Sequence, residues 1–317
     1  MVSKTLPRRT VLQGLGGLAV AGAARAETAP GATGEFGFVA IGDWGRKGGM
    51  RQGDVAVAMG KAAAEVESRF VLSAGDNFYP AGVESATDEH WRKSFQDVYT
   101  APALQTPWIA ALGNHDYRGH PGAQVAYART NRRWRMPSRY YALGGAEFGV
   151  PQLEVFVLDT TPIVGGDAEA LMRLTRGRVT LPDPEPQVAW LAAALAGSTA
   201  EWKLVVGHHP IRSGGRHGDS AILQARIEPL LAAHGVQAYI CGHDHDLQHI
   251  RAGGTDHICT GSGSSCGDAF DVEGGLFRQS VEGFAMFRLD GETLRLDFRD
   301  FTGRTLHQSA IPKGPVA

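Results

Sequence analysis

The sequence predicts an α/β protein, and three observations support this fold class. Short apolar runs alternate along the chain with longer segments of helical periodicity. All but one of the apolar runs in this alternating part lead into a glycine followed by Asp, Asn or His. The chain has 317 residues, of which 43% are hydrophobic and 20% charged, so it can form a large core and is neither disordered nor fibrous.

The expected elements follow one another from residue 35. We expect strands at Phe36–Ile41, Phe70–Ser73, Trp108–Leu112, Leu153–Leu158, Lys203–Val206 and Gln237–Cys241. We expect helices at Val55–Val66, Thr87–Tyr99, Gln187–Leu195 and Ile222–His234. After residue 249 the pattern changes to short runs separated by Gly and Asp, which predict antiparallel strands closing a second sheet: His257–Cys259, Phe284–Phe287 and Leu294–Phe298. No internal repeat is present, so residues 35–317 are expected to form one domain.

The N-terminal segment, residues 1–26, has the pattern of an export signal. Basic residues precede a weakly apolar run, Val11–Ala23, and Ala24–Ala26 forms a small-x-small cleavage pattern. The adjacent pair Arg8 and Arg9 resembles a bacterial twin-arginine signal. An ordinary secretory signal is the alternative. Residues 27–34 are interpreted as a linker.

The expected cleavage of this signal changes the charge of the protein, and export sets its expected location. The apolar run is shorter than the roughly 20 residues that a membrane span needs. Removal of residues 1–26 takes away four positive charges and no acidic residue, which changes the formal net charge from −2 to −6. No basic nucleic-acid-binding surface is therefore evident. We expect a monomeric periplasmic or secreted protein without a membrane span.

The three cysteines do not form a recognisable framework. Cys241, Cys259 and Cys266 lack the spacing of a zinc ribbon. Cys241 lies in an apolar run and is interpreted as a buried thiol. A bridge between Cys259 and Cys266 is left open.

Five polar motifs lie where expected strands end. Ligand sites of open α/β sheets collect at this edge, and the glycine of each motif permits a sharp turn. A single Gly-Asp pair is more often a turn, but five motifs in the same position predict a site for hard or borderline cations, without thiolate ligands. The motifs are Gly42–Gly45, Gly75–Tyr79, Gly113–Asp116, Gly207–Pro210 and Gly242–His245.

With these motifs the sequence resembles the purple acid phosphatases, specifically their small, tartrate-resistant type, within the metallophosphoesterases. The resemblance extends from Glu35 to Pro312, with longer matches over Gly75–Gly82, Pro107–Asp116 and Ala238–Gln248. It implies a four-layer α/β/β/α sandwich with a metal site at the carboxyl ends of the strands. It also implies that residues 35–317 form a single catalytic domain.

The resemblance implies two unequal metal sites that share Asp76. His243 and His245 lie two residues apart on an extended segment, so both should point to one side with Asp244 turned away. Tyr79 would supply a phenolate that favours ferric iron; a core tyrosine is the alternative. The implied ligands of Fe(III) are Asp43, Asp76, Tyr79 and His245. Those of a divalent ion, Fe(II), Zn(II) or Mn(II), are Asp76, Asn114, His208 and His243.

Two further histidines, His115 and His217, are the candidate catalytic residues. An imidazolium at either position would stabilise phosphate oxygens or protonate the leaving group. Asp116 could orient His115 or cap a helix, and both readings stay open. His209 stands where the animal members commonly have Tyr, and its role is left open.

The implied function is that of an acid phosphatase, which hydrolyses phosphate monoesters of small molecules or phosphoproteins by attack of a metal-bound hydroxide. A phosphodiesterase or nucleotide hydrolase on the same metals is the nearest alternative. A non-catalytic iron- or phosphate-binding or redox role is another. The loop Pro162–Pro186 is a candidate lid over the site, and Lys47, Arg212 and Arg216 are candidate attractors of anionic substrates.

Overall fold

Two mixed sheets of seven strands each form the centre of the computed structural model, which describes residues 35–165, 173, 175 and 177–314. The first sheet has the order β14-β13-β12-β1-β2-β3-β4 and the second β11-β9-β10-β8-β7-β6-β5. The strands of the first are β1 (Phe36–Ile41), β2 (Val71–Ser73), β3 (Trp108–Ala110), β4 (Trp134–Arg135), β12 (Gly283–Leu289), β13 (Thr293–Asp300) and β14 (Thr305–Pro312). Those of the second are β5 (Tyr141–Gly144), β6 (Leu153–Val157), β7 (Trp202–Val206), β8 (Ala238–Cys241), β9 (Leu247–Ala252), β10 (Thr255–Thr260) and β11 (Gly275–Gln279).

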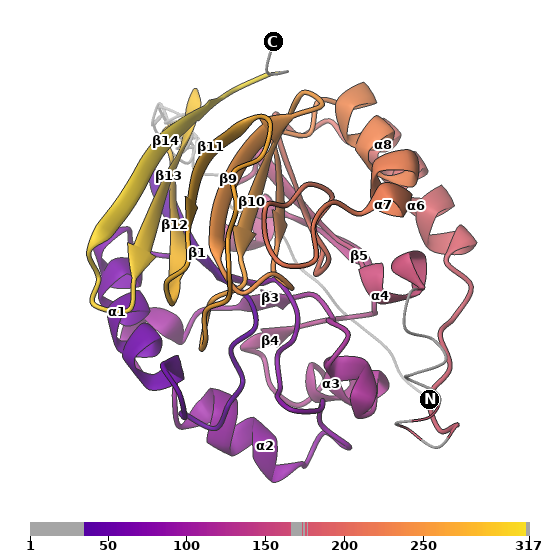
Figure 1. The fold of residues 1–317 in the computed structure, drawn as a ribbon, viewed down its shortest axis with the longest axis vertical. Coiled ribbons are helices and arrows are strands. Elements are labelled where there is room, and N and C mark those ends of the chain that lie inside the picture. The colour runs from indigo at the N-terminus through magenta and orange to yellow at the C-terminus, as the bar shows by residue number, and fades with distance from the viewer. Residues whose placement is uncertain (1–34, 166–172, 174, 176, 315–317) are drawn as a thin grey trace, which may run out of the picture. The chain divides into compact units, whose positions relative to one another are not determined.

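Helices cover the outer faces of both sheets, which gives the expected four layers (Figure 1). Helix α1 packs beside β1 and β12, and α6, α7 and α8 pack on the second sheet. The helices are α1 (Gln52–Glu65), α2 (Glu89–Trp91), α3 (Pro121–Tyr127), α4 (Thr160–Val164), α6 (Glu185–Gly197), α7 (Ala221–Arg226) and α8 (Glu228–Ala233). The predicted fold class is confirmed.

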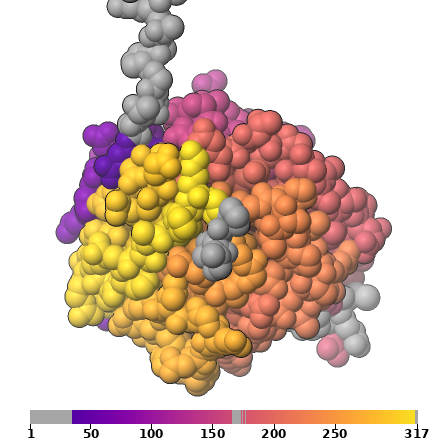
Figure 2. Space-filling view, turned by 90° about the horizontal axis from the view of Figure 1, so that it is seen from above, coloured from indigo at the N-terminus to yellow at the C-terminus, as the bar shows by residue number. Residues whose placement is uncertain are grey.

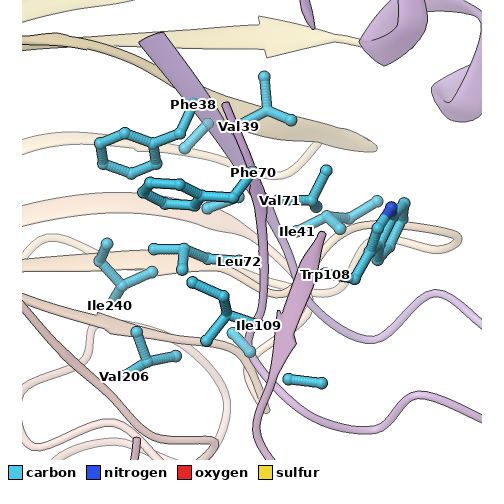
Figure 3. Close-up of a cluster of buried hydrophobic side chains, with 14 of the residues drawn as sticks. Phe38, Val39, Ile41, Phe70, Val71, Leu72, Trp108, Ile109, Val206 and Ile240 are labelled. Atoms are coloured by element: carbon cyan, nitrogen blue, oxygen red, sulfur yellow. The ribbon is translucent and has the colours of Figure 1, made fainter. Parts of the chain in front are cut away.

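The core between the sheets follows from the two-residue period of strands. Alternate side chains of a strand point to opposite faces. Val206 of β7 therefore packs toward the first sheet, whereas Val205 packs toward the helices. Figure 3 shows Val206 and Ile240 on one side of this layer and Phe38 on the other. The ring of Phe38 also stacks on that of Phe287, with centroids 4.5 Å apart.

Two predicted helices differ in the structure from their expected form. The helix expected at Thr87–Tyr99 begins at Glu89, where the Asp88 side chain accepts a hydrogen bond from the His90 backbone, and it continues as a π-helical turn to Gln96. The helix expected at Ile222–His234 is divided into α7 and α8. Pro229 lies in the first turn of α8, and a proline has no N–H to continue the preceding helix.

The expectation that the C-terminal strands close a second sheet holds for His257–Cys259, which lies in β10, and is wrong for Phe284–Phe287 and Leu294–Phe298. Strands β12, β13 and β14 extend the first sheet beside β1, with Phe36 opposite Leu289. Strand β10 pairs in parallel with β8, with His257 opposite Tyr239. Hydrophobic patterning marks a strand but carries no information about which neighbour it joins. Figure 2 shows how much of one face these orange and yellow segments form.

Several other expectations concern the termini, loops and cysteines. The export signal and the linker fall on residues 1–34, which lie outside the described residues. The candidate lid, Pro162–Pro186, is described except for residues 166–172, 174 and 176. The first part of that lid is helical in α4. All three cysteines are free, so the Cys259–Cys266 bridge is not formed, and Cys241 is buried as expected. None of the described helices has the length and apolar character to span a membrane.

Candidate metal centre

The polar motifs converge at the carboxyl ends of strands from both sheets. Asp43, Asp76 and Asn114 follow strands of the first sheet, and His208 and His243 follow strands of the second. Backbone hydrogen bonds join the sheets here: Gly42 N donates to Thr260 O at 2.9 Å. The site therefore lies where the carboxyl ends of strands from the two sheets meet, as expected for the four-layer fold.

Three of the converging residues have an unusual backbone conformation. Asp43, Asp76 and His243 have φ angles of 59°, 48° and 71°. Few non-glycine residues adopt this left-handed region, and those that do are held there by their surroundings, often at functional sites. At these three positions the strained backbone coincides with the convergence of polar side chains.

At two motif positions only glycine fits, because a side chain would collide with a neighbouring carboxylate. A Cβ atom on Gly113 would lie 2.2 Å from Oδ1 of Asp76, and one on Gly242 would lie 2.3 Å from Oδ2 of Asp43. The expected reason for these glycines was a sharp turn. The structure shows that close approach of a carboxylate is the reason at these two positions.

The Tyr79 hydroxyl is the centre of one cluster. It lies 2.7 Å from Oδ1 of Asp43, 2.8 Å from Oδ2 of Asp76 and 3.1 Å from Nε2 of His245. A hydroxyl has one proton and can donate to only one of these three atoms. The cluster therefore has more lone pairs than protons to fill them, and a bound cation would accept the remaining lone pairs.

A second cluster surrounds Nε2 of His208. Nδ1 of His208 donates to Ala74 O at 3.0 Å, so Nε2 carries a lone pair. Nε2 lies 3.0 Å from Oδ1 of Asn114 and 3.3 Å from Nδ1 of His243. Nδ1 of His243 is itself 3.1 Å from Oδ1 of Asn114. Amide oxygen and imidazole nitrogen thus point at one another, as they do around a bound metal ion.

Asp76 belongs to both clusters. Its Oδ2 contacts the Tyr79 hydroxyl, and its Oδ1 lies 3.5 Å from Nε2 of His208. Oδ1 also accepts a 2.7 Å hydrogen bond from the His115 backbone, which fixes the carboxylate between the clusters. The structure therefore places Asp76 where the sequence expected a bridging ligand.

The electrostatics of the site fit cations. The Asp43 and Asp76 side chains are 0% and 2% exposed, and within the described part of the chain neither forms an ion pair with a lysine or arginine. Buried carboxylates require a compensating charge. Burial, followed by the charges of Asp43 and Asp76, raises the pKa of Tyr79 well above its ordinary value. Burial lowers the pKa of His208, but the charges of Asp76 and Asp43 outweigh this and raise it.

The two candidate catalytic histidines flank the clusters. The ring of His115 packs against Tyr79 with centroids 4.4 Å apart, and burial lowers its pKa. Its Nδ1 lies 2.7 Å from Pro80 O and 3.0 Å from a guanidinium nitrogen of Arg118. The ring of His217 stacks on His243 at 4.1 Å, and its side chain is 48% exposed. Both histidines therefore reach the site from outside the two clusters.

Asp116 does not orient His115. The Asp116 carboxylate is buried and accepts hydrogen bonds from the backbone of Gly113 at 2.9 Å and of Asn77 at 3.1 Å. It fixes the loops that carry Asn114 and Asp76. Burial, followed by the charge of Asp76, raises the pKa of Asp116 to about 7.

Sequence reasoning missed the contribution of Arg46. Its guanidinium lies 3.8 Å above the Tyr79 ring, and its Nε donates to the Ser264 hydroxyl at 3.0 Å. In the sequence, only the position of Arg46 directly after the Gly42–Gly45 motif could have indicated this contribution.

Arg212, which was expected to attract anionic substrates, instead pairs with Glu228 at 2.8 Å.

His209 also joins the site. Its ring lies 4.4 Å from that of His243, and His208, His209 and His243 each offer an atom within 4.8 Å of the others. Burial, followed by the charge of His208, lowers the pKa of His209 well below its ordinary value.

Comparison with known proteins agrees with this arrangement. Residues 36–247 match the family described as calcineurin-like phosphoesterase. The chain is 33% identical to tartrate-resistant acid phosphatase type 5 of Oryctolagus cuniculus, over 90% of this chain and 93% of the relative. It is 36% identical to purple acid phosphatase 17 of Arabidopsis thaliana, over 88% and 85%. The chain belongs to the purple acid phosphatases.

Two solved structures share the fold of this chain. The structure titled "GAP50 the anchor in the inner membrane complex of Plasmodium" has a TM-score of 0.74 at 23% identity, over 88% of this chain and 89% of that one. Purple acid phosphatase PPD1 from yellow lupin has a TM-score of 0.66 at 14% identity, over 90% and 55%. These similarities concern the fold alone.

Proposed function

We propose that this protein is an acid phosphatase that hydrolyses phosphate monoesters at a dinuclear metal centre. The observation that carries the proposal is the position of Asp76 between two clusters of converging ligand atoms. A shared carboxylate is how a protein places two cations close enough to act on one phosphate.

The two clusters supply the ligands of the two cations. Asp43, Asp76, Tyr79 and His245 would hold one ion, and Asp76, Asn114, His208 and His243 the other. When bound, such a pair neutralises phosphate charge and lowers the pKa of water. The first ion is proposed to be Fe(III), because the buried Tyr79 phenol needs a strongly charged cation to ionise, and the second to be Fe(II), Zn(II) or Mn(II).

His217 is proposed to protonate the leaving group. Its Nδ1 donates to Asp244, so its exposed Nε2 remains free to carry the proton that the leaving oxygen needs. Nδ1 of His115 is engaged by Pro80 O and by the Arg118 guanidinium, and Nε2 lies 4.0 Å from Oδ2 of Asp76. We assign His115 to contact with the substrate.

Relative rates on two model substrates test the activity. The metal-loaded protein should hydrolyse p-nitrophenyl phosphate much faster than bis(p-nitrophenyl) phosphate at pH 5. A preference for the diester would support the phosphodiesterase alternative. Negligible turnover of both, with two metals bound, would support a non-catalytic role.

The identity of the first metal is tested by colour. The wild type should contain two metal ions per chain and absorb visible light through the Tyr79 phenolate. Tyr79→Phe should lose this absorption, whereas Tyr140→Phe, a change outside the two clusters, should keep it. A colourless wild type with two zinc or manganese ions would refute Fe(III).

We propose that the protein is exported as a folded protein to the periplasm. The Arg8–Arg9 pair before a weakly apolar run supports this. Fractionation of cells that produce the Arg8→Lys, Arg9→Lys variant should find it in the cytoplasm. Periplasmic recovery equal to that of the wild type would favour an ordinary secretory signal.

A further inference from the structure

Three histidines meet where the second sheet ends, and the ligand set proposed above uses only two of them. His208, His209 and His243 all offer nitrogen atoms within 4.8 Å of one another. Proximity alone would allow His209 to be a third metal ligand. The hydrogen bonds of its ring show which of its nitrogen atoms has a lone pair to offer a metal ion.

The hydroxyl of Thr160 decides the protonation of His209. This buried oxygen accepts hydrogen bonds from the backbone N–H of His208 at 3.2 Å and of His209 at 3.0 Å. It also lies 2.8 Å from Nδ1 of His209. A threonine hydroxyl has two lone pairs and one proton. Both lone pairs are used by the backbone, so the proton is donated to Nδ1 of His209.

The tautomer follows from this count. Nδ1 of His209 accepts a proton from Thr160 and carries none itself, so the ring is neutral with its proton on Nε2. His208 has the opposite arrangement, because its Nδ1 donates to Ala74 O at 3.0 Å. The two adjacent histidines therefore present different atoms: His208 presents a lone pair and His209 an N–H.

We infer that His209 is a hydrogen-bond donor to a phosphate oxygen of the substrate and not a metal ligand, with Thr160 as the residue that positions it. This inference rests on the proposed function, since it assigns the donor to the phosphate bound at the same centre. Metal coordination requires a lone pair on the nitrogen, and Nε2 of His209 has none to offer.

The surroundings of His209 agree with contact to a substrate. Its ring packs against that of His243, and His209 as a residue is 7% exposed, whereas His208 is fully buried. Thr160 is in turn held by Gln187, whose side chain makes hydrogen bonds of 2.7 and 2.9 Å to the backbone N–H and C=O of the preceding residue, Asp159. The donor is thus fixed before the substrate arrives, which is the condition for electrostatic stabilisation without reorganisation.

The His209→Phe variant tests the inference, because it keeps a ring and removes both nitrogens. Metal content is measured by elemental analysis, and the affinity for inorganic phosphate by calorimetric titration of the metal-loaded protein. We expect two metals per chain, as in the wild type, and phosphate binding at least tenfold weaker, since a hydrogen bond to a charged group is lost. His209→Gln, which places an amide N–H near Nε2, should recover most of the affinity.

Variants of Thr160 test the positioning role. Thr160→Val removes the hydroxyl and should weaken phosphate binding with the metal content unchanged, whereas Thr160→Ser should behave as the wild type. Loss of one metal from His209→Phe, or unchanged phosphate affinity in both His209→Phe and Thr160→Val, would overturn the inference. Absence of metals or turnover in the wild type would instead contradict the proposed function.

Discussion

Nδ1 of His217 donates a 2.8 Å hydrogen bond to the carboxylate of Asp244. Asp244 lies between His243 and His245 in the sequence but turns away from both clusters, as expected for the middle residue of an extended segment. Its second oxygen accepts a hydrogen bond from the Ser213 hydroxyl. The residue between two proposed metal ligands thus holds the proposed proton donor.

Replacement of Asp244 should therefore separate proton transfer from metal binding. We expect Asp244→Asn to lower kcat on p-nitrophenyl phosphate by roughly 10- to 100-fold, because His217 loses its acceptor. Metal content, measured in parallel, should stay at two ions per chain. Asp271→Asn, a highly exposed carboxylate, is the control and should leave kcat unchanged. A normal kcat in Asp244→Asn would remove His217 from the mechanism.

Metal removal should destabilise the protein. Asp43 and Asp76 are buried without a cationic side-chain partner other than histidine among the described residues. A ligand at 1,000 times its Kd stabilises the native state by about 4 kcal/mol, and its loss should lower the Tm by roughly 10 °C. Thermal unfolding with and without chelator measures this shift. In Asp76→Asn the chelator should have little further effect, while in the exposed variant Asp54→Asn it should act as in the wild type.

Asp159 should make stability fall as the pH rises. Burial raises the pKa of Asp159 to about 7, above the unfolded value near 4. Between these values the folded state holds a proton that the unfolded state has lost, so unfolding becomes easier with increasing pH. One such group contributes at most about 1.4 kcal/mol per pH unit.

Urea unfolding between pH 4 and pH 8 checks the Asp159 prediction. Asp159→Asn should show a weaker decline over this range than the wild type, because its amide does not ionise. Asp159 and Asp183 both line a cavity beside Pro162 and Gln187, and Asp183 is exposed. Asp183→Asn should therefore follow the wild type. If the free energy of unfolding of Asp159→Asn and of the wild type fell equally with pH, Asp159 would not control the pH dependence of stability.

Docking of the two sheets should depend on Phe38. This side chain is fully buried and stacks on Phe70 and Phe287. Phe38→Ala should destabilise the protein by about 3–5 kcal/mol in urea unfolding, through lost burial and the cavity that remains. Val57→Ala, which truncates a side chain that is 61% exposed, should cost little. A loss of less than about 1 kcal/mol in Phe38→Ala would mean that neighbouring side chains between the two sheets fill the space left by the ring.

The sequence predicted most strands because each is a short apolar run, and five of these runs lead into a polar motif. Phe36–Ile41 was predicted with the bounds that β1 has in the structure. The pairing of β10 with β8, and of β12 with β1, could not be predicted. Both pairings join segments of similar pattern, and the choice between sheets is made by packing across the whole core.

The polar motifs were predictable because each follows an expected strand, whereas the choice of ligands within the motifs came from the resemblance to the purple acid phosphatases. The role of His209 was not predictable, since it depends on the Thr160 hydroxyl 49 residues earlier. The contribution of Arg46 was not predictable for a similar reason, because its position above the Tyr79 ring results from the packing of two loops. Contacts of this kind have no periodicity in the sequence.

The division of the centre between two sheets affects when it can form during synthesis of the chain. Oδ1 of Asn114 and Nε2 of His208 meet across 94 residues, and His245 follows later still. A growing chain that has completed only the first three strands offers a few isolated oxygen and nitrogen atoms that hold metal weakly. Full occupancy therefore comes after both sheets have docked, and metal content becomes a measure of how many chains have finished folding.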